Sequence, residues 1–162
     1  VDNETSYSTD MFMEMRVAFY LQRVMGMHQQ QCCDSEHALK TLPAAQLLKA
    51  ATLDGAACAG LQDKVGSLTP GKQADLVMIS VSDLNLYPSG NAFGTVVHAA
   101  ERSNIGTVMI GGRIVKQNGK VLGVDSARLR AAIDESREHL FAASGYQPDI
   151  FADTFLPLVQ AD

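Results

Sequence analysis

The pattern of hydrophobic and polar residues changes several times along the chain, and each change predicts a different kind of structure. After a polar start of nine residues, apolar residues recur at spacings of three and four: Met11, Met15, Ala18, Phe19 and Val24. This spacing predicts a helix that begins after Thr9 or Asp10 and ends near Met27. Residues 29–40 are expected to form a loop, although the glutamine run at 29–31 can also extend the helix.

A second helical pattern runs from Pro43 to Gly60. Pro43 suits a first helical position, where no backbone N–H is needed. The apolar side of this helix comprises Leu47, Leu48, Ala51 and Ala57. Residues 50–57 are mostly small, which permits another part of the chain to pack closely against them. Gly55 either breaks the helix or lies where another backbone approaches; we expect a break and two short helices.

From Val65 onward the apolar runs become short, and glycine and proline separate them. The apolar run within residues 75–80 predicts a strand that is buried on both faces, and residues 95–100 predict a shorter strand. Segments 106–110 and 113–116 flank Gly111-Gly112, a pair that suits a two-residue hairpin turn. Asn118-Gly119 offers a further turn directly afterwards, so a β-meander is expected.

The last predicted element is an amphipathic helix from about Ser126 to Ala143. Asp125 or Ser126 can accept hydrogen bonds at its start, and Gly145 ends it. One face of this helix is apolar and comprises Leu129, Ala132, Ile133, Leu140 and Phe141. The tail to Asp162 is expected to be extended and packed on another part of the protein.

Composition excludes several classes of function. The formal net charge of −5 and the pI near 5.3 come without any cluster of Lys and Arg, which argues against nucleic-acid binding. The apolar runs are far shorter than the roughly 20 residues that cross a bilayer. No secretory signal is visible, although the chain begins with Val1 and a signal can precede it. Three irregularly spaced cysteines, Cys32, Cys33 and Cys58, predict reduced thiols and a cytoplasmic protein.

The spacing of metal-binding residue types reveals no complete site. The histidines are His28, His37, His98 and His139, and none belongs to a His-x-His or His-Glu-x-x-His pattern. Because a catalytic zinc site needs about three protein ligands, we interpret them as solvated or hydrogen-bonded. His98 lies among apolar residues and is interpreted as a core or interface histidine whose hydrogen-bonding groups are satisfied. Arg16 and Arg23 are expected to be solvated or paired, and the methionines near residues 11–27 to pack in the core.

Three motifs follow one another in a recognisable order. Residues 65–77 read as a glycine-bounded turn that leads through the small Ala74 and through Asp75, which can bind turn N–H groups, into a strand. Residues 50–57 precede this turn with the pattern A-T-x-x-G-A, and residues 107–115 follow it with V-x-V-x-G-x-x-V in approximate form. Together they resemble the C-terminal signature of the amidohydrolase superfamily over about residues 1–123. The likeness is nearest to the branch with atrazine chlorohydrolase, cytosine deaminase and adenosine-derivative deaminases.

The resemblance assigns a role to the start of the chain. Val1-Asp2-Asn3 is similar to the end of the family's eighth barrel strand, where an aspartate binds the catalytic metal and handles a proton. Asp2 is the one residue we carry over, both as catalytic residue and as metal ligand; the substrate-binding residues stay unknown. Tyr7 follows in the next loop, but we do not assign it a substrate contact. The resemblance implies one divalent metal ion, zinc or iron, in the intact enzyme and none bound by this chain alone.

The implied fold is an α+β fragment in three parts. Residues 1–62 correspond to the last strand-loop and outer helices of a (β/α)8 barrel, residues 63–123 to part of a small β-sandwich, and residues 124–162 to a C-terminal helix, which packs back across, and its tail. The implied partners are a missing N-terminal barrel segment, a small heterocyclic substrate and further copies of the protein, without nucleic acid or membrane.

The implied reaction is hydrolysis of a C–N or C–Cl bond in a cyclic nitrogenous substrate by metal-activated water, and we favour deamination. This chain alone is expected to be inactive. The alternative is a non-catalytic β-rich module for binding or oligomerisation. A fragment should expose the surfaces that the missing part covers, whereas a free-standing module should close its own core.

Overall fold

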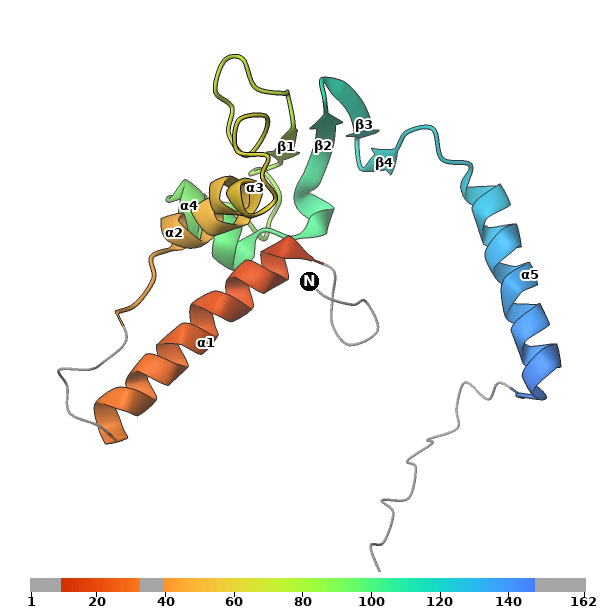
Figure 1. Ribbon diagram of the computed structural model, residues 1–162, viewed down its shortest axis with the longest axis horizontal. Coiled ribbons are helices and arrows are strands. Elements are labelled where there is room, and N and C mark those ends of the chain that lie inside the picture. Colours follow the sequence, from red (N-terminus) through yellow and green to blue (C-terminus); the bar gives the residue numbers. More distant parts are fainter. Residues whose placement is uncertain (1–9, 33–39, 148–162) are drawn as a thin grey trace, which may run out of the picture. The chain divides into compact units, whose positions relative to one another are not determined.

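The computed structural model describes residues 10–32 and 40–147 (Figure 1). The chain divides into two compact units, Val1–Leu122 and Gly123–Asp162. The first unit holds helices and a four-stranded antiparallel sheet, and the second holds a single helix in its described part. The expected mixture of helices and strands is therefore confirmed.

Helix α1 (Met11–Cys32) is longer than the spacing of its apolar residues predicts. It continues through the glutamine run, as the alternative interpretation allowed. At its start, Asp10 accepts a hydrogen bond from the backbone N–H of Phe12 through Oδ1, at 3.0 Å. One side of α1 packs against the core, where the side chains of Met15, Leu47 and Val97 are buried together.

The segment after Pro43 is one helical run instead of the two helices that we expected. It comprises α2 (Ala44–Lys49), a π-helical segment (Ala50–Asp54) and α3 (Gly55–Cys58). Gly55 has helical angles, φ −60° and ψ −43°, so it does not break the helix. Among the described residues, the only atom within 4 Å of a Cβ at Gly55 would be the carbonyl oxygen of Ala50, at 3.4 Å, so no other described segment approaches this position. A glycine in a helix weakens it without ending it, and the surrounding packing holds the helical conformation.

The small residues of this helical run do permit a close approach, and the partner is Gly66. A Cβ at Gly66 would lie 2.8 Å from the Cβ of Ala56 and 3.1 Å from the carbonyl oxygen of Thr52. Gly66 also has a φ of +89°, which disfavours any residue with a side chain. The A-T-x-x-G-A motif and Gly66, the first glycine of the motif that follows it, therefore pack directly against each other.

The sheet contains strands β1 (Leu76–Ile79), β2 (Ile105–Ile110), β3 (Arg113–Gln117) and β4 (Lys120–Val121), in the order β1-β2-β3-β4. All neighbouring pairs are antiparallel. The β2–β3 turn has positive φ at Gly111 (55°) and Gly112 (79°), as the Gly-Gly pair predicts. The predicted β-meander is confirmed for β2, β3 and β4.

Asp75 binds the N–H group of a distant turn. Its Oδ1 accepts a hydrogen bond from the backbone N–H of Gly111 at 2.6 Å. The N–H of Gly112 donates to the carbonyl oxygen of Ala74 at 3.0 Å. The Ala74-Asp75 pair thus holds the tip of the β2–β3 hairpin, which links the second motif to the third.

Two strand predictions need correction. Residues 95–99 are helical and residue 100 is extended, because α4 (Ala92–Gly94) continues into a π-helical segment (Thr95–Ala99). Asn91 caps this helical run by accepting the N–H of Gly94 at 2.9 Å, and this local signal outweighs the strand preference of the β-branched residues. Strand β1 is not covered on both faces by the described residues, since Val77 and Met78 are 52% and 59% exposed.

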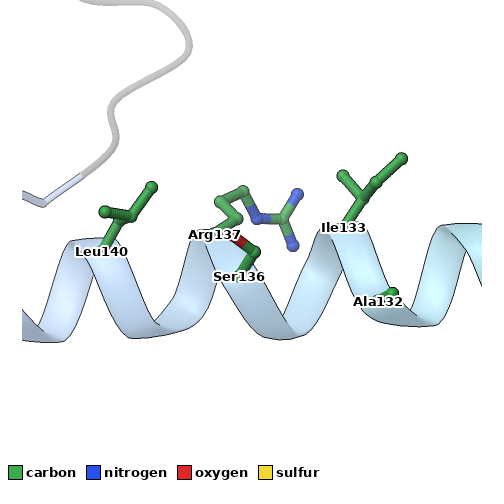
Figure 2. A pocket seen from close by; sticks show the side chains of 5 residues that line it. All are labelled: Ala132, Ile133, Ser136, Arg137 and Leu140. Carbon is green, nitrogen blue, oxygen red and sulfur yellow. The ribbon is translucent and has the colours of Figure 1, made fainter.

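In the second unit, helix α5 (Ser126–Ser144) agrees with the prediction. Asp125 accepts hydrogen bonds from the N–H groups of Ala127 and Arg128, and Gly145 ends the helix with a φ of 67°. In the described part of the chain no residue of α5 is buried. Figure 2 shows Ile133 and Leu140 on the same side of the helix, along a shallow hollow that also involves Ser136 and Arg137.

Candidate functional site

The residue that the family resemblance assigns to the metal, Asp2, lies outside the described residues. The same holds for Tyr7, Cys33 and His37. The first described residue after Asp2 in the sequence is Asp10, which directly precedes helix α1.

Two contacts tie the start of α1 to residues 100–104. Nη2 of Arg16 donates a hydrogen bond to the carbonyl oxygen of Ala100 at 2.9 Å. Oδ2 of Asp10 lies 3.6 Å from Nε of Arg102. Between these elements is an open hollow of about 320 Å³, to which Glu101 also contributes. Two acidic and two basic side chains line the hollow, so its charge favours neither an anion nor a cation.

Residues 100–104 are themselves held by a buried polar network around Asn104, which is 3% exposed. Its Nδ2 donates to Oδ2 of Asp83 at 2.8 Å and to Oδ1 of Asn85 at 2.9 Å. Its Oδ1 accepts from the backbone N–H of Glu101 at 2.9 Å. Because every hydrogen-bonding atom of the Asn104 amide has a partner, the network fixes the loop that precedes β2. Sequence reasoning missed Asn104, since a single asparagine before a strand belongs to no motif.

No described histidine belongs to a group of residues that could hold a metal ion. The ring of His98 lies 4.1 Å from that of Phe19 in an edge-to-face arrangement, and its buried Nδ1 has no partner among the described residues. His98 is thus packed against an aromatic ring as expected, but the expectation that its ring is also hydrogen-bonded is not met at Nδ1 among the described residues. Nδ1 of the exposed His28 is 3.7 Å from Sγ of Cys32, and His139 is exposed on α5. No group of three or more His, Cys, Asp or Glu residues in the described part of the chain could hold a metal ion.

Arg23 agrees with its interpretation as a paired side chain. It donates to the carbonyl oxygens of Phe19 at 3.1 Å and of Leu42 at 3.2 Å, and its guanidinium carbon lies 3.2 Å from the centre of the Phe19 ring. The expectation for the methionines is met in part. Met15 is buried in the core, whereas Met25 and Met27 are 49% and 61% exposed. None of the helices described here is both long and apolar enough to cross a membrane.

The described side chains do not identify a family by themselves, but the chain is similar to known proteins. The model of the Amidohydrolase family matches residues 2–115, a range that begins at Asp2 and includes all three motifs. A 5-methylthioadenosine/S-adenosylhomocysteine deaminase from Desulforamulus reducens is 30% identical over 131 residues, which cover 81% of this chain and 28% of the relative. The corresponding deaminase from Moorella thermoacetica is 35% identical over 92 residues, which cover 57% of this chain and 22% of the relative.

The chain is also similar to solved structures. An adenosine deaminase from Xanthomonas campestris with bound zinc superposes with a TM-score of 0.67 at 32% identity, over 82% of this chain and 28% of that protein. Atrazine chlorohydrolase from Arthrobacter aurescens, in complex with zinc, superposes with a TM-score of 0.64 at 20% identity, over 76% of this chain and 25% of that protein. The second likeness concerns the fold alone. This chain therefore spans only about a quarter of the length of the proteins it matches.

Proposed function

Because the chain belongs to the amidohydrolase family, we propose that it is the C-terminal part of a metal-dependent deaminase that acts on an adenosine-type nucleoside. The observation that carries this proposal is the likeness to 5-methylthioadenosine/S-adenosylhomocysteine deaminases, at 30% identity over 81% of the chain. The likeness to a zinc-bound adenosine deaminase supports the same substrate class. The reaction replaces the exocyclic amine of the purine ring by oxygen from water and releases ammonia.

We propose that residues 1–62 complete a (β/α)8 barrel, that residues 63–123 form part of a β-sandwich, and that residues 124–162 are a C-terminal helix and tail. Support comes from helix α1, which is apolar on two sides. One side packs in the core through Met15. Val17, Leu21 and Val24 lie on the other side and are 37%, 55% and 62% exposed. A helix that is apolar on several sides is normally buried. The missing N-terminal barrel segment would cover these residues.

The distribution of hydrophobic side chains also disfavours the alternative of a free-standing module. In the described part of the chain the buried hydrophobic residues are few: Met15, Leu47, Ala56, Leu86, Val97 and Ala100. Many more large hydrophobic side chains are exposed, including Val77 and Met78 of β1. A module that closes its own core would bury most of these side chains, because each one left in water forfeits about 1.5–3 kcal/mol.

We further propose that Asp2 binds a divalent metal ion, zinc in particular, together with histidines that precede Val1. The zinc bound to the structurally similar adenosine deaminase supports this choice of metal. The described residues contain no ligand set of their own, so this chain would contribute Asp2 alone. When bound, zinc supplies a water molecule whose pKa falls toward ~7. Asp2, kept ionised beside the cation, would accept a proton from the attacking water and return it to the departing amine.

The intact protein is also proposed to be cytoplasmic and homo-oligomeric. The thiols of Cys32 and Cys58 are free and exposed, which fits a reducing compartment. The exposed apolar side of α5, with Leu129, Ile133 and Leu140, would suit contact with another part of the assembly.

Removal of the metal tests the proposed function. The full-length protein, with the residues that precede Val1, should release ammonia from adenosine, 5-methylthioadenosine or S-adenosylhomocysteine. A chelator should abolish this activity, and added zinc should restore it, because the activated water depends on the ion. The measurement is ammonia release, with chloride release from atrazine as a parallel assay. Release of chloride without ammonia would refute deamination but would still support a hydrolase. Activity that persists after complete metal removal would refute the proposed function.

A further inference from the structure

We propose that helix α5 pairs antiparallel with α5 of a second copy of this chain, around a two-fold axis. The inference deepens the homo-oligomer part of the proposed function and rests on it, but it does not depend on the reaction that the protein catalyses. Two features of α5 carry it: an exposed apolar stripe, and charges of both signs along one border of that stripe.

The apolar stripe comprises Leu129, Ile133 and Leu140, which are 53%, 57% and 61% exposed. Together with Ser136 these residues follow the alternating spacing of four, three and four that keeps side chains on one face of paired helices. Figure 2 shows Ile133 and Leu140 on the same side of the helix. Ser136 lies near the middle of the stripe, and its small side chain leaves room for a second helix to approach closely.

One border of the stripe carries charges of both signs. Nη2 of Arg137 donates to Oδ1 of Asp134 at 3.1 Å, and both side chains are 56% exposed. Arg130 lies four residues before Asp134, so the two are neighbours on the same side of the helix. The order along this border is therefore positive, negative and positive. A partner surface that fits this order has to offer opposite charges beside an apolar stripe.

A second α5 offers such a surface. A two-fold axis perpendicular to an antiparallel pair brings the same border of each helix together, because an isologous contact uses the same patch of both copies. When the axis passes between Glu135 and Ser136, Arg137 lies at the height of Asp134 of the partner subunit. Symmetry repeats this pair on the other side of the axis. The charges that pair within one helix thus also match between the two copies.

The same arrangement makes the two apolar stripes overlap. Leu129 then lies within two residues of Leu140 of the partner subunit, about 3 Å along the helix at 1.5 Å per residue. A parallel pair would instead turn the charged border of each helix toward the other border of its partner, where Ala132 and Ala143 carry no charge. The charges therefore favour the antiparallel pair.

The first test replaces Ile133 by glutamate in the full-length protein and measures the dimer dissociation constant by analytical ultracentrifugation. We expect Ile133→Glu to raise this constant about 100-fold or more, because every dimer loses two apolar contacts and gains two charges in their place. Ala142→Glu is the matched control. Ala142 is exposed and lies nine residues further along α5, on the opposite side of the helix at about 100° per residue. Its replacement should leave the dissociation constant unchanged.

The second test uses the charges. Asp134→Arg alone and Arg137→Asp alone each place like charges opposite one another in the dimer, and each should raise the dissociation constant about 10-fold. An equimolar mixture of the two variants should dimerise again. Arg137 of the first variant then faces Asp134 of the second, and the two introduced side chains face each other with opposite charges. Because both variants lack the ion pair within the helix, recovery on mixing has to come from contacts between copies.

The outcomes separate this inference from the proposed function. If the unmodified protein is a monomer, the proposed oligomer fails and the inference fails with it. If the protein is a dimer that Ile133→Glu leaves intact, or that Ala142→Glu weakens equally, the inference alone is overturned. If Ile133→Glu dissociates the dimer but the charge variants do not recover on mixing, the antiparallel pairing is overturned. The measured quantity is molecular mass, so a failure to deaminate adenosine leaves this inference standing.

Discussion

Replacing Asp2 by asparagine in the full-length protein will lower the kcat of deamination by about 10²- to 10⁴-fold, the usual contribution of a general acid–base group. Asparagine keeps the size of the side chain but has no negative charge and cannot accept the proton of the attacking water. The ion should also bind less tightly, since a carboxylate ligand at roughly 2.0–2.2 Å becomes a neutral amide. The measurements are kcat and the zinc content per protein molecule after dialysis.

Glu4→Gln is the matched control for this substitution. This substitution removes one negative charge from the same short segment, two positions after Asp2. Glu4 itself belongs to no motif. We expect both kcat and zinc content to stay near those of the unmodified protein. Equal losses in the two variants would mean that the general charge of the segment matters, and would contradict a specific role for Asp2.

Replacing Gly66 by alanine should destabilise the protein by about 2–5 kcal/mol. Part of this loss, about 1–2 kcal/mol, arises because a residue with a Cβ is strained at a φ of +89°. The rest, about 1–3 kcal/mol, arises because the new methyl group would lie 2.8 Å from the Cβ of Ala56 and must push the helix away. The loss should appear as a lower melting temperature of the full-length protein.

Gly71→Ala separates the two contributions. Gly71 has a similar φ of +94°, but a Cβ there would meet nothing within 4 Å. Its replacement should therefore show the backbone strain alone. Adding Ala56→Gly to Gly66→Ala should recover part of the stability, because it removes one of the overlapping carbon atoms. If Gly66→Ala and Gly71→Ala lower the melting temperature equally, the close approach of Gly66 to the helix does not contribute to stability.

The sequence was informative wherever a few neighbouring residues determine the local structure. The Gly111-Gly112 turn, the cap at Asp125 and the end of α5 at Gly145 depend on a few neighbouring residues, and all three predictions are confirmed. Residues 95–100 were wrongly predicted as a strand because the side chain of Asn91, four positions earlier, starts a helix there. The β-branched residues alone gave no indication of that cap.

Contacts between distant residues were harder to predict. The motif containing Asp75 was recognised as a turn that binds N–H groups, but the N–H that it binds belongs to Gly111, 36 positions later. Asn104 was not singled out at all, because its partners Asp83 and Asn85 meet it only in the folded chain. Burial was also mispredicted in β1, where Val77 and Met78 are exposed although a strand covered on both faces was expected.

For the candidate site, the order of the three motifs was sufficient to identify the family, whose model matches residues 2–115. The ligand set could not be obtained in the same way. A metal centre is an arrangement in space, and this chain offers one candidate ligand, Asp2, eight positions before the first described residue. The contact of Arg16 could not be predicted for a similar reason. Its hydrogen-bond acceptor is the backbone carbonyl oxygen of Ala100, and no side-chain pattern in the sequence points to a backbone atom.

The most direct test of the central claim is the distance between the carboxylate of Asp2 and a bound zinc ion in the full-length protein. It can be measured in a crystal structure in which anomalous scattering at the zinc absorption edge locates the ion. The account predicts one carboxylate oxygen at roughly 2.0–2.2 Å from the zinc, the usual zinc–carboxylate distance, with the remaining protein ligands contributed by residues that precede Val1. A zinc ion coordinated without Asp2, or an Asp2 carboxylate that faces solvent away from the ion, would contradict the account.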